Sequence, residues 1–163
     1  MQPAKTLDII VPCFNPRMGW EKLLINSVLK VKQNLPEGTL NSVILVNDGS
    51  IEVLNDDVIE SLLEAVPEGK LIEYKRNRGK GYAVRTGVKS SEADIQVYTD
   101  VDFPYVEESV VEFYNLLNDN EADVVVASRG DSYYDSLSAF RRILSKSLRW
   151  VNGLLFGLKI NDT

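Results

Sequence analysis

Two aspartates separated by one residue, Asp100 and Asp102, directly follow the apolar, β-rich run Ile95–Tyr98. Successive side chains of an extended strand alternate between faces, so we expect these two carboxylates to point the same way. Neighbouring carboxylates repel each other unless a cation lies between them, and a Mg²⁺ or Mn²⁺ ion that carries nucleotide phosphates is the natural occupant. The pair therefore predicts a divalent metal site. A strand end with two solvated aspartates is the alternative.

Two further loops carry residues that suit a phosphorylated ligand. Asp48, followed by a Gly-Ser turn, can accept a hydrogen bond from a base N–H or a ribose hydroxyl, or can bond its own backbone. Gly79 and Gly81 allow the chain to run close to a ligand, and the helix that they begin presents unpaired N–H groups. Lys80 and Arg85 add positive charge there, although a helix start with ordinary surface cations also explains them.

The apolar patterns along the chain predict the elements that position these residues. Short β-branched runs are typical of buried strands, and one-face helical spacing recurs between them. The expected strands are Leu7–Val11, Val43–Val46, Leu71–Tyr74, Ile95–Tyr98 and Val124–Ala127. Helical patterns span Trp20–Val31, Val58–Leu63, Val106–Leu117 and Leu137–Val151, and a further helix begins after Asn77. This alternation predicts an α/β fold with a mostly parallel sheet, helices on both faces, and a site at the carboxyl ends of the strands.

The composition excludes several kinds of site. The chain has 163 residues, no histidine and one cysteine, Cys13, which removes Ser-His-Asp triads, His-ligated zinc and internal disulfides. The formal net charge of −6 argues against nucleic-acid binding. The sequence has no signal-peptide pattern and no apolar run of the ~20 residues that a spanning helix needs. Since cysteine usage also fits a reducing compartment, we expect a cytoplasmic protein.

The last segment of the chain has the opposite charge. Residues 137–163 hold five Arg or Lys residues against one acid, Asp162. Such a segment suits phosphates or an anionic membrane surface, which would bring the protein to the inner face of a membrane as a peripheral protein. Core packing explains the apolar stripe from Leu137 to Val151 without any membrane, so both interpretations stay open.

Five segments together resemble a known enzyme family. They are Val11–Asn15, Val46–Ser50, Asn77–Gly87, Thr99–Asp102 and Ala127–Arg129, each at or just after an expected strand. In this order and spacing they resemble the family 2 glycosyltransferases of the GT-A fold. Within that family they are most similar to the dolichol-phosphate mannose synthase-like polyprenyl-phosphate glycosyltransferases. The resemblance covers nearly the whole chain and implies a Rossmann-like GT-A architecture.

The resemblance implies a role for each matching residue. The positions that match nucleotide-binding residues are Pro12, Phe14, Asn15, Asp48, Asn77, Lys80, Arg85, Asp100 and Val101. Asp100 and Asp102 match the ligands of a divalent metal, Mg²⁺ or Mn²⁺. Asp102, Arg129 and Arg141 match catalytic positions, and the two arginines suit phosphate because a planar guanidinium binds phosphate oxygens in pairs. Arg142 replaces Arg141 if the register shifts by one residue.

The resemblance also implies a reaction and its partners. One sugar would move, with inversion, from a GDP- or UDP-sugar donor to a polyprenyl or dolichyl phosphate acceptor at a membrane surface. An acceptor phosphate is already anionic near neutral pH and needs no strong general base, which suits a chain without histidine. The alternatives are a saccharide hydroxyl as acceptor, which would require a base carboxylate, and a truncated nucleotide-binding domain without turnover.

The sequence departs from the family pattern at four positions and at its end. The family commonly has Tyr, Glu, Asp and Gln where this chain has Phe14, Pro16, Asn47 and Pro104. Pro104 withholds a metal ligand, so the ion must take more water or substrate oxygen. The chain stops at Thr163, within a family segment that continues. We therefore expect one catalytic domain, residues 1–163, truncated on its acceptor side, and a homodimer driven by the apolar surface left exposed.

Overall fold

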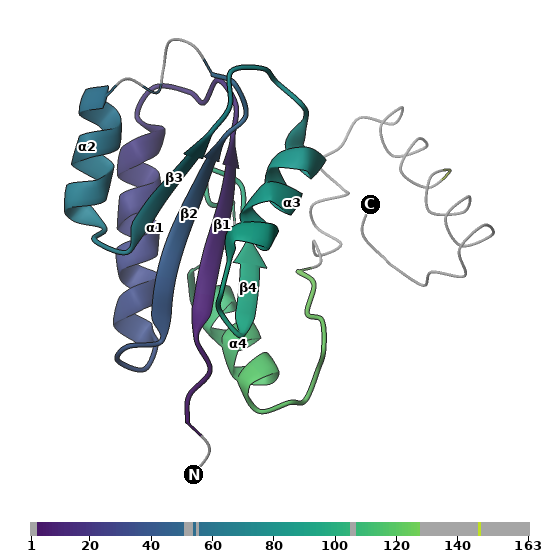
Figure 1. Ribbon diagram of the computed structural model, residues 1–163. Helices are drawn as coiled ribbons and strands as arrows, with labels where there is room; N and C mark the ends of the chain where they lie inside the picture. Colours follow the sequence, from purple (N-terminus) through teal and green to yellow (C-terminus); the bar gives the residue numbers. More distant parts are fainter. Residues whose placement is uncertain (1–2, 51–53, 55, 105–106, 128–146, 148–163) are drawn as a thin grey trace. The chain divides into compact units, whose positions relative to one another are not determined.

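The computed structural model describes residues 3–50, 54, 56–104, 107–127 and 147. The chain divides into two compact units, residues 1–125 and 126–163, and nearly all described residues belong to the first. In this unit strands and helices alternate (Figure 1). The order of the described elements is β1 (Leu7–Cys13), α1 (Trp20–Asn34), β2 (Leu40–Asn47), α2 (Asp56–Ala65), β3 (Gly69–Glu73), α3 (Lys80–Ser90), β4 (Ile95–Tyr98) and α4 (Glu107–Asn118).

The described strands form one parallel sheet in the order β3-β2-β1-β4. In the centre of the sheet, Ile9 of β1 pairs with Val43 of β2 on one side and with Val97 of β4 on the other. Every residue of β1 is buried, as expected for a parallel strand with helices on both faces. The expected α/β fold with a parallel sheet is confirmed.

Helices cover both faces of this sheet (Figure 1). Ile9 and Val11 of β1 belong to the core that includes Leu24 of α1, Leu62 of α2 and Tyr114 of α4. On the opposite face, a smaller core joins α3 to the two central strands; it consists of Ile10, Ile44, Val46 and Ala83. Alternate residues of β1 therefore serve different cores, as strand geometry requires.

The close contact of α3 with the sheet depends on a glycine. A Cβ atom at Gly87 would collide with Cγ2 of Ile10 and would lie 3.3 Å from Cγ2 of Val46. The absence of a side chain thus lets α3 pack directly on β1 and β2. Since α3 begins beside the carboxyl ends of these strands, this packing also fixes where its first turn lies.

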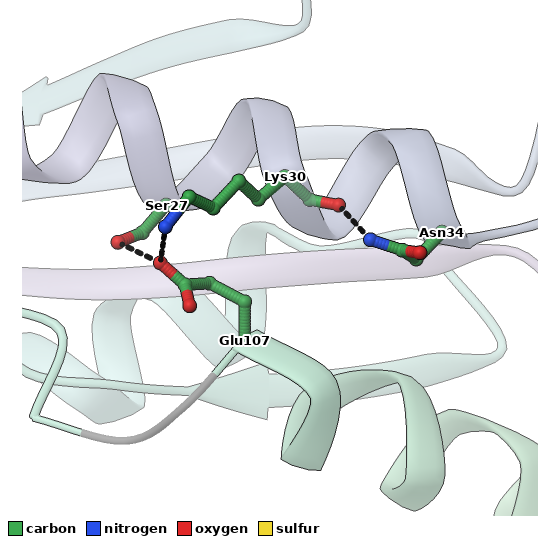
Figure 2. A network of polar contacts seen from close by, with 4 residues as sticks. All are labelled: Ser27, Lys30, Asn34 and Glu107. Atoms are coloured by element: carbon green, nitrogen blue, oxygen red, sulfur yellow. Dashed lines mark hydrogen bonds and ion pairs between the residues drawn. The ribbon is translucent and has the colours of Figure 1, made fainter.

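Polar contacts tie α4 to α1 on the other face (Figure 2). The Ser27 hydroxyl donates a hydrogen bond to Oε1 of Glu107 at 3.0 Å, and the Lys30 ammonium lies 3.3 Å from the same oxygen. The side-chain amide of Asn34 donates to the backbone carbonyl of Lys30 at 2.8 Å. The backbone N–H of Glu107 and the Ser27 hydroxyl lower the pKa of the Glu107 carboxyl, because both stabilise its charged form.

The expected strand Val124–Ala127 is wrong, since these residues are described and lie in no strand. Val124 and Val126 are largely exposed. A β-branched run becomes a strand only where a neighbour pairs with its N–H and C=O groups, and the described sheet ends at β4. The other expected strands are confirmed, and β1 and β2 are longer than expected. The helical pattern Leu137–Val151 lies, Ser147 apart, outside the described residues.

Candidate nucleotide-binding site

The carboxyl ends of β1, β2 and β4 open onto a cleft with a volume of about 650 Å³. The loops after these strands and the first turns of α1 and α3 line it, since parallel strands bring their carboxyl ends to one edge. The lining residues are Pro12, Cys13, Phe14, Asn15, Pro16, Arg17, Met18, Trp20, Leu23, Asp48, Asn77, Lys80, Ala83, Asp100, Val101 and Asp102. The cleft thus brings together all the predicted nucleotide-binding residues except Arg85, together with Asp102.

Asp48 is the most buried acidic side chain of the cleft, with 2% of its surface exposed. Its carboxylate accepts hydrogen bonds from the backbone N–H groups of Arg78 at 2.8 Å and Gly79 at 2.9 Å, and from the side-chain amide of Asn77 at 3.1 Å. The described hydrogen bonds of the Asp48 carboxylate therefore hold the loop before α3 in place. They do not go to the backbone of the loop that contains Asp48. The described bonds thus differ from the turn interpretation, and a hydrogen bond from Asp48 to a base or ribose stays a prediction.

Glycines shape the two loops that Asp48 connects. Gly49 has a φ of +80°, and a Cβ atom there would lie 2.7 Å from the backbone nitrogen of Asn77. Gly79 has a φ of +90° and precedes α3, whose start has no side-chain cap among the described residues. Lys80 and Ala83 of the first turn of α3 line the cleft, and the positive end of the helix together with the Lys80 ammonium favours an anion there.

The loop after β1 supplies the apolar part of the cleft. The Phe14 ring is half exposed, and Asn15 adopts a left-handed conformation with a φ of +43°. The backbone N–H of Asn15 donates to the Ser50 hydroxyl at 2.9 Å, and the backbone N–H of Ser50 donates to Oδ1 of Asn47 at 2.8 Å. These bonds hold the loop after β1 against the loop after β2, so the position of the Phe14 ring is set by both.

The two aspartates lie in a turn and not on a strand face, which corrects the expectation from alternating side chains. β4 ends at Tyr98, and the backbone N–H of Phe103 donates to the carbonyl of Asp100 at 2.9 Å. Phe103 has a φ of +45°, so the extended chain has already reversed there. Asp100 and Asp102 nevertheless both line the cleft. The Lys80 ammonium lies 2.5 Å from Oδ1 of Asp100, across the cleft from α3.

Burial raises the pKa of two further side chains near the cleft. It raises the pKa of the Cys13 thiol to about 12, because the thiolate would lie among apolar atoms. Burial first, and then the nearby Asp48 carboxylate, also raise the pKa of Tyr74. The Tyr74 hydroxyl is buried without a hydrogen-bond partner among the described residues, and its ring meets that of Tyr82 edge to face at 5.5 Å.

Three of the residues assigned from the sequence do not lie in the described cleft. Arg85 is exposed on α3 and is not part of the cleft lining. Arg129 and Arg141 lie outside the described residues, as does the alternative, Arg142.

Sequence reasoning missed the wall formed by the start of α1. Met18, Trp20 and Leu23 all line the cleft. The helical pattern placed Leu23 and Leu24 on one apolar face, yet Leu24 is buried and Leu23 is exposed. Adjacent helical residues point about 100° apart, and in this helix Leu24 faces the core whereas Leu23 lies at the edge of the apolar face. Nothing in the sequence distinguishes the two leucines or marks Met18.

Comparison with known proteins identifies the family. The sequence matches the profile of "Glycosyl transferase family 2" over residues 8–161. The dolichyl-phosphate beta-glucosyltransferase of Drosophila melanogaster is 28% identical over 173 residues, which cover 99% of this chain and 53% of that protein. The human enzyme of the same name gives the same identity and coverage. The chain thus spans about half the length of these relatives.

Two solved structures share the fold. The crystal structure of S. aureus TarS 1-349 has a TM-score of 0.59 and 21% identity, covering 77% of this chain and 37% of that one. Mannosyltransferase PcManGT from Pyrobaculum calidifontis, in complex with GDP-Man and Mn²⁺, has a TM-score of 0.57 and 21% identity, covering 82% and 38%. Together with the profile match, the sheet and the covering helices show that this chain has the GT-A fold and belongs to glycosyl transferase family 2.

Proposed function

We propose that this chain moves a sugar, with inversion, from a GDP- or UDP-sugar to a polyprenyl or dolichyl phosphate. The observation that carries the proposal is the cleft, in which Asp48 and Asn77 lie with Lys80, Asp100 and Asp102. A nucleotide diphosphate-sugar donor is supported by PcManGT, which holds GDP-Man and Mn²⁺. A lipid-phosphate acceptor is supported by the dolichyl-phosphate glucosyltransferases that this chain resembles over nearly its whole length.

The residues of the cleft suit different parts of such a donor. Pro12 and the half-exposed Phe14 ring offer an apolar surface to a base. Asp48 holds the loop at Asn77, where amide groups can meet a base or ribose. The uncapped first turn of α3 and the Lys80 ammonium offer positive charge to the diphosphate. Under this proposal Arg85 contributes only long-range charge.

Asp100 and Asp102 are the residues that would hold a divalent metal. Carboxylate oxygens are hard donors that Mg²⁺ and Mn²⁺ prefer. No group of three or more His, Cys, Asp or Glu side chains within the described ranges could hold an ion by itself. Two carboxylates fit an ion that takes its other ligands from the diphosphate and water. When bound, such an ion stabilises the charge that develops on the leaving diphosphate.

The acceptor side of the proposal rests on residues outside the described ranges. Arg129 and Arg141 would hold the acceptor phosphate, and Asp102 would face the reacting sugar. The basic residues of the segment 137–163 would meet an anionic membrane surface, and a second copy of the chain would cover its apolar stripe. Among the helices that the structure describes, none combines the length and the hydropathy required to cross a membrane.

A nucleotide panel followed by a transfer assay tests the proposal. We expect GDP-mannose, UDP-glucose or a related donor to raise the melting temperature more in Mn²⁺ than in EDTA. Radiolabelled sugar should then move into dolichyl phosphate and be recovered in the organic phase. Transfer to a saccharide hydroxyl would overturn the acceptor assignment. Donor binding without transfer to any acceptor would leave a nucleotide-binding domain without turnover.

A further inference from the structure

The Lys80–Asp100 ion pair lies where two parts of the proposed donor site meet. Lys80 belongs to the first turn of α3, and Asp100 to the loop after β4. The Lys80 ammonium lies 2.5 Å from Oδ1 of Asp100 and 6.0 Å from the centre of the Tyr98 ring. Both side chains line the cleft, so the pair joins the start of α3 to the loop after β4 within it.

The ammonium occupies one of the two Asp100 oxygens that a metal ion could take. A carboxylate oxygen that lies 2.5 Å from an ammonium cannot also coordinate a divalent cation on the same side, because the two cations repel each other. The neighbouring carboxylate of Asp102 has no ion pair with a described residue. Among the described residues the two carboxylates are therefore unequal, since Asp100 has a cationic partner there and Asp102 has none.

We infer that Lys80 is a displaceable counter-ion, which neutralises Asp100 in the free protein and moves to the donor diphosphate when a divalent metal takes its place. This inference rests on the proposed nucleotide-sugar site and assigns Lys80 a positioning role within it. The ammonium has three donors on a flexible stem, so it can exchange one anion for another without backbone movement. The nearest place for that second anion is the uncapped first turn of α3, to which Lys80 itself belongs.

The exposure of the pair makes the exchange easy. The side chains of Lys80 and Asp100 are 57% and 45% exposed. Ion pairs in contact with water contribute little, so the pair should weaken metal binding by only about two- to five-fold. A fully buried pair would be costly to break and would exclude the metal. The arrangement therefore keeps Asp100 neutralised without closing the site.

Manganese binding in the absence of nucleotide tests the competition directly. Free Mn²⁺ measured by EPR should show that Lys80→Met binds the ion about two- to five-fold more tightly than the parent. The matched control is Lys89→Met, which removes one exposed lysine from the last turn of the same helix and should leave the affinity unchanged. Lys80→Gln, which keeps a polar side chain, should behave as Lys80→Met does.

A double-mutant cycle separates competition at Asp100 from a general loss of positive charge. In the Asp100→Asn background, Lys80→Met should no longer tighten Mn²⁺ binding, because the carboxylate charge for which the two cations compete is gone. Equal tightening in both backgrounds, or no tightening in either, would overturn the inference. Calorimetry with GDP and UDP at a Mn²⁺ concentration that saturates both proteins tests the second half, since Lys80→Met should then weaken the nucleotide that binds by about three-fold or more.

Failure of this inference and failure of the proposed function give different results. If the parent protein binds neither nucleotide, the proposed function fails, whereas the Mn²⁺ measurements need no nucleotide. If nucleotide binding at saturating Mn²⁺ is the same in Lys80→Met and in the parent, Lys80 does not move to the diphosphate and the inference is overturned. If Lys80→Met weakens the nucleotide while tightening Mn²⁺ through Asp100, both halves of the exchange are supported.

Discussion

The carboxylate of Asp48, at the end of β2, accepts a hydrogen bond at 2.9 Å from the backbone N–H of Gly79, which precedes α3. The same carboxylate accepts the N–H of Arg78 and the side-chain amide of Asn77. A single buried charge therefore organises the loop that begins α3. Because Lys80 follows this loop directly, the placement of the cationic wall of the cleft depends on an anion from a different strand.

Asp48→Asn should destabilise the protein. The substitution keeps the shape of the side chain but removes the charge, and it presents an amide nitrogen to at least one backbone N–H that needs an acceptor. We expect the free energy of unfolding to fall by about 1–3 kcal/mol, measured by urea denaturation. Asp123→Asn, at an exposed position, is the control and should change little. Equal denaturation midpoints for the two variants would show that the Asp48 bonds do not hold the loop.

Asp102→Asn should remove much of the metal-dependent part of nucleotide binding. The carboxylate lines the cleft and has no ion pair with a described residue, so it is available to a cation. Loss of even an indirect metal contact typically lowers metal affinity 10–100-fold, so we expect a loss on the order of 10-fold for nucleotide measured in Mn²⁺. Calorimetry in EDTA should give parent-like affinity. If affinity in Mn²⁺ also matches that of the parent, Asp102 is not a metal ligand.

Gly87→Ala and Gly81→Ala should affect stability in opposite directions, although both lie in α3. Alanine favours a helix over glycine by about 1 kcal/mol. At Gly81 the new Cβ atom would have no neighbour within 4 Å, so that gain should appear in full or in part. At Gly87 the Cβ atom would collide with Ile10, which forces α3 off the sheet and should cost about 1–3 kcal/mol. Thermal unfolding of the two variants measures the difference, and similar melting temperatures would contradict the packing described for α3.

The sequence predicted the sheet better than it predicted the site, for physical reasons. β1 and β2 are buried on both faces, so their apolar runs are visible without knowledge of the fold. Val124–Ala127 has the same composition but no pairing partner in the described sheet, and pairing is not encoded in composition. The partners of a polar side chain are equally non-local, which is why the bonds from Asp48 to residues near Gly79 could not be read from the sequence.

The prediction for the two aspartates reached the right place by an incorrect route. Alternation along a strand suggested that Asp100 and Asp102 share a face, but the strand ends at Tyr98. The turn closed between Asp100 and Phe103 brings both carboxylates to the cleft instead. The family resemblance selects the same two positions because it depends on the order of the motifs and not on the local backbone conformation, and their role as metal ligands stays a prediction.

Ser27→Ala should lower the free energy of unfolding at neutral pH, because the Glu107 carboxylate loses a hydrogen bond that stabilises its charged form. The Ser27 hydroxyl helps to lower the pKa of Glu107, so its contribution is present above the unfolded pKa of about 4.3 and is lost as pH falls through the folded value. The difference in unfolding free energy between parent and variant should therefore shrink below about pH 4. In a Glu107→Gln background the same substitution should show no such pH dependence. If the effect of Ser27→Ala on the free energy of unfolding is independent of pH in both backgrounds, the Ser27 hydrogen bond does not act through the charge of Glu107.

Cys13 should be almost unreactive in the folded protein even though it lines the cleft. It is 1% exposed, burial raises its pKa to about 12, and it is the chain's single cysteine, so a thiol reagent reports on one site. Since the thiolate is the reactive form, labelling by DTNB at pH 8 should be on the order of 10³-fold slower in native buffer than in urea. Because folding raises the pKa of Cys13, the folded protein keeps the thiol proton over a pH range in which the unfolded chain releases it. Stability should therefore fall as pH rises above the unfolded value of about 8.5, and Cys13→Ala should remove that part of the decline. Labelling as fast in native buffer as in urea would show that solvent reaches Cys13 through the cleft. The thiol would then not be buried, and the prediction would be wrong.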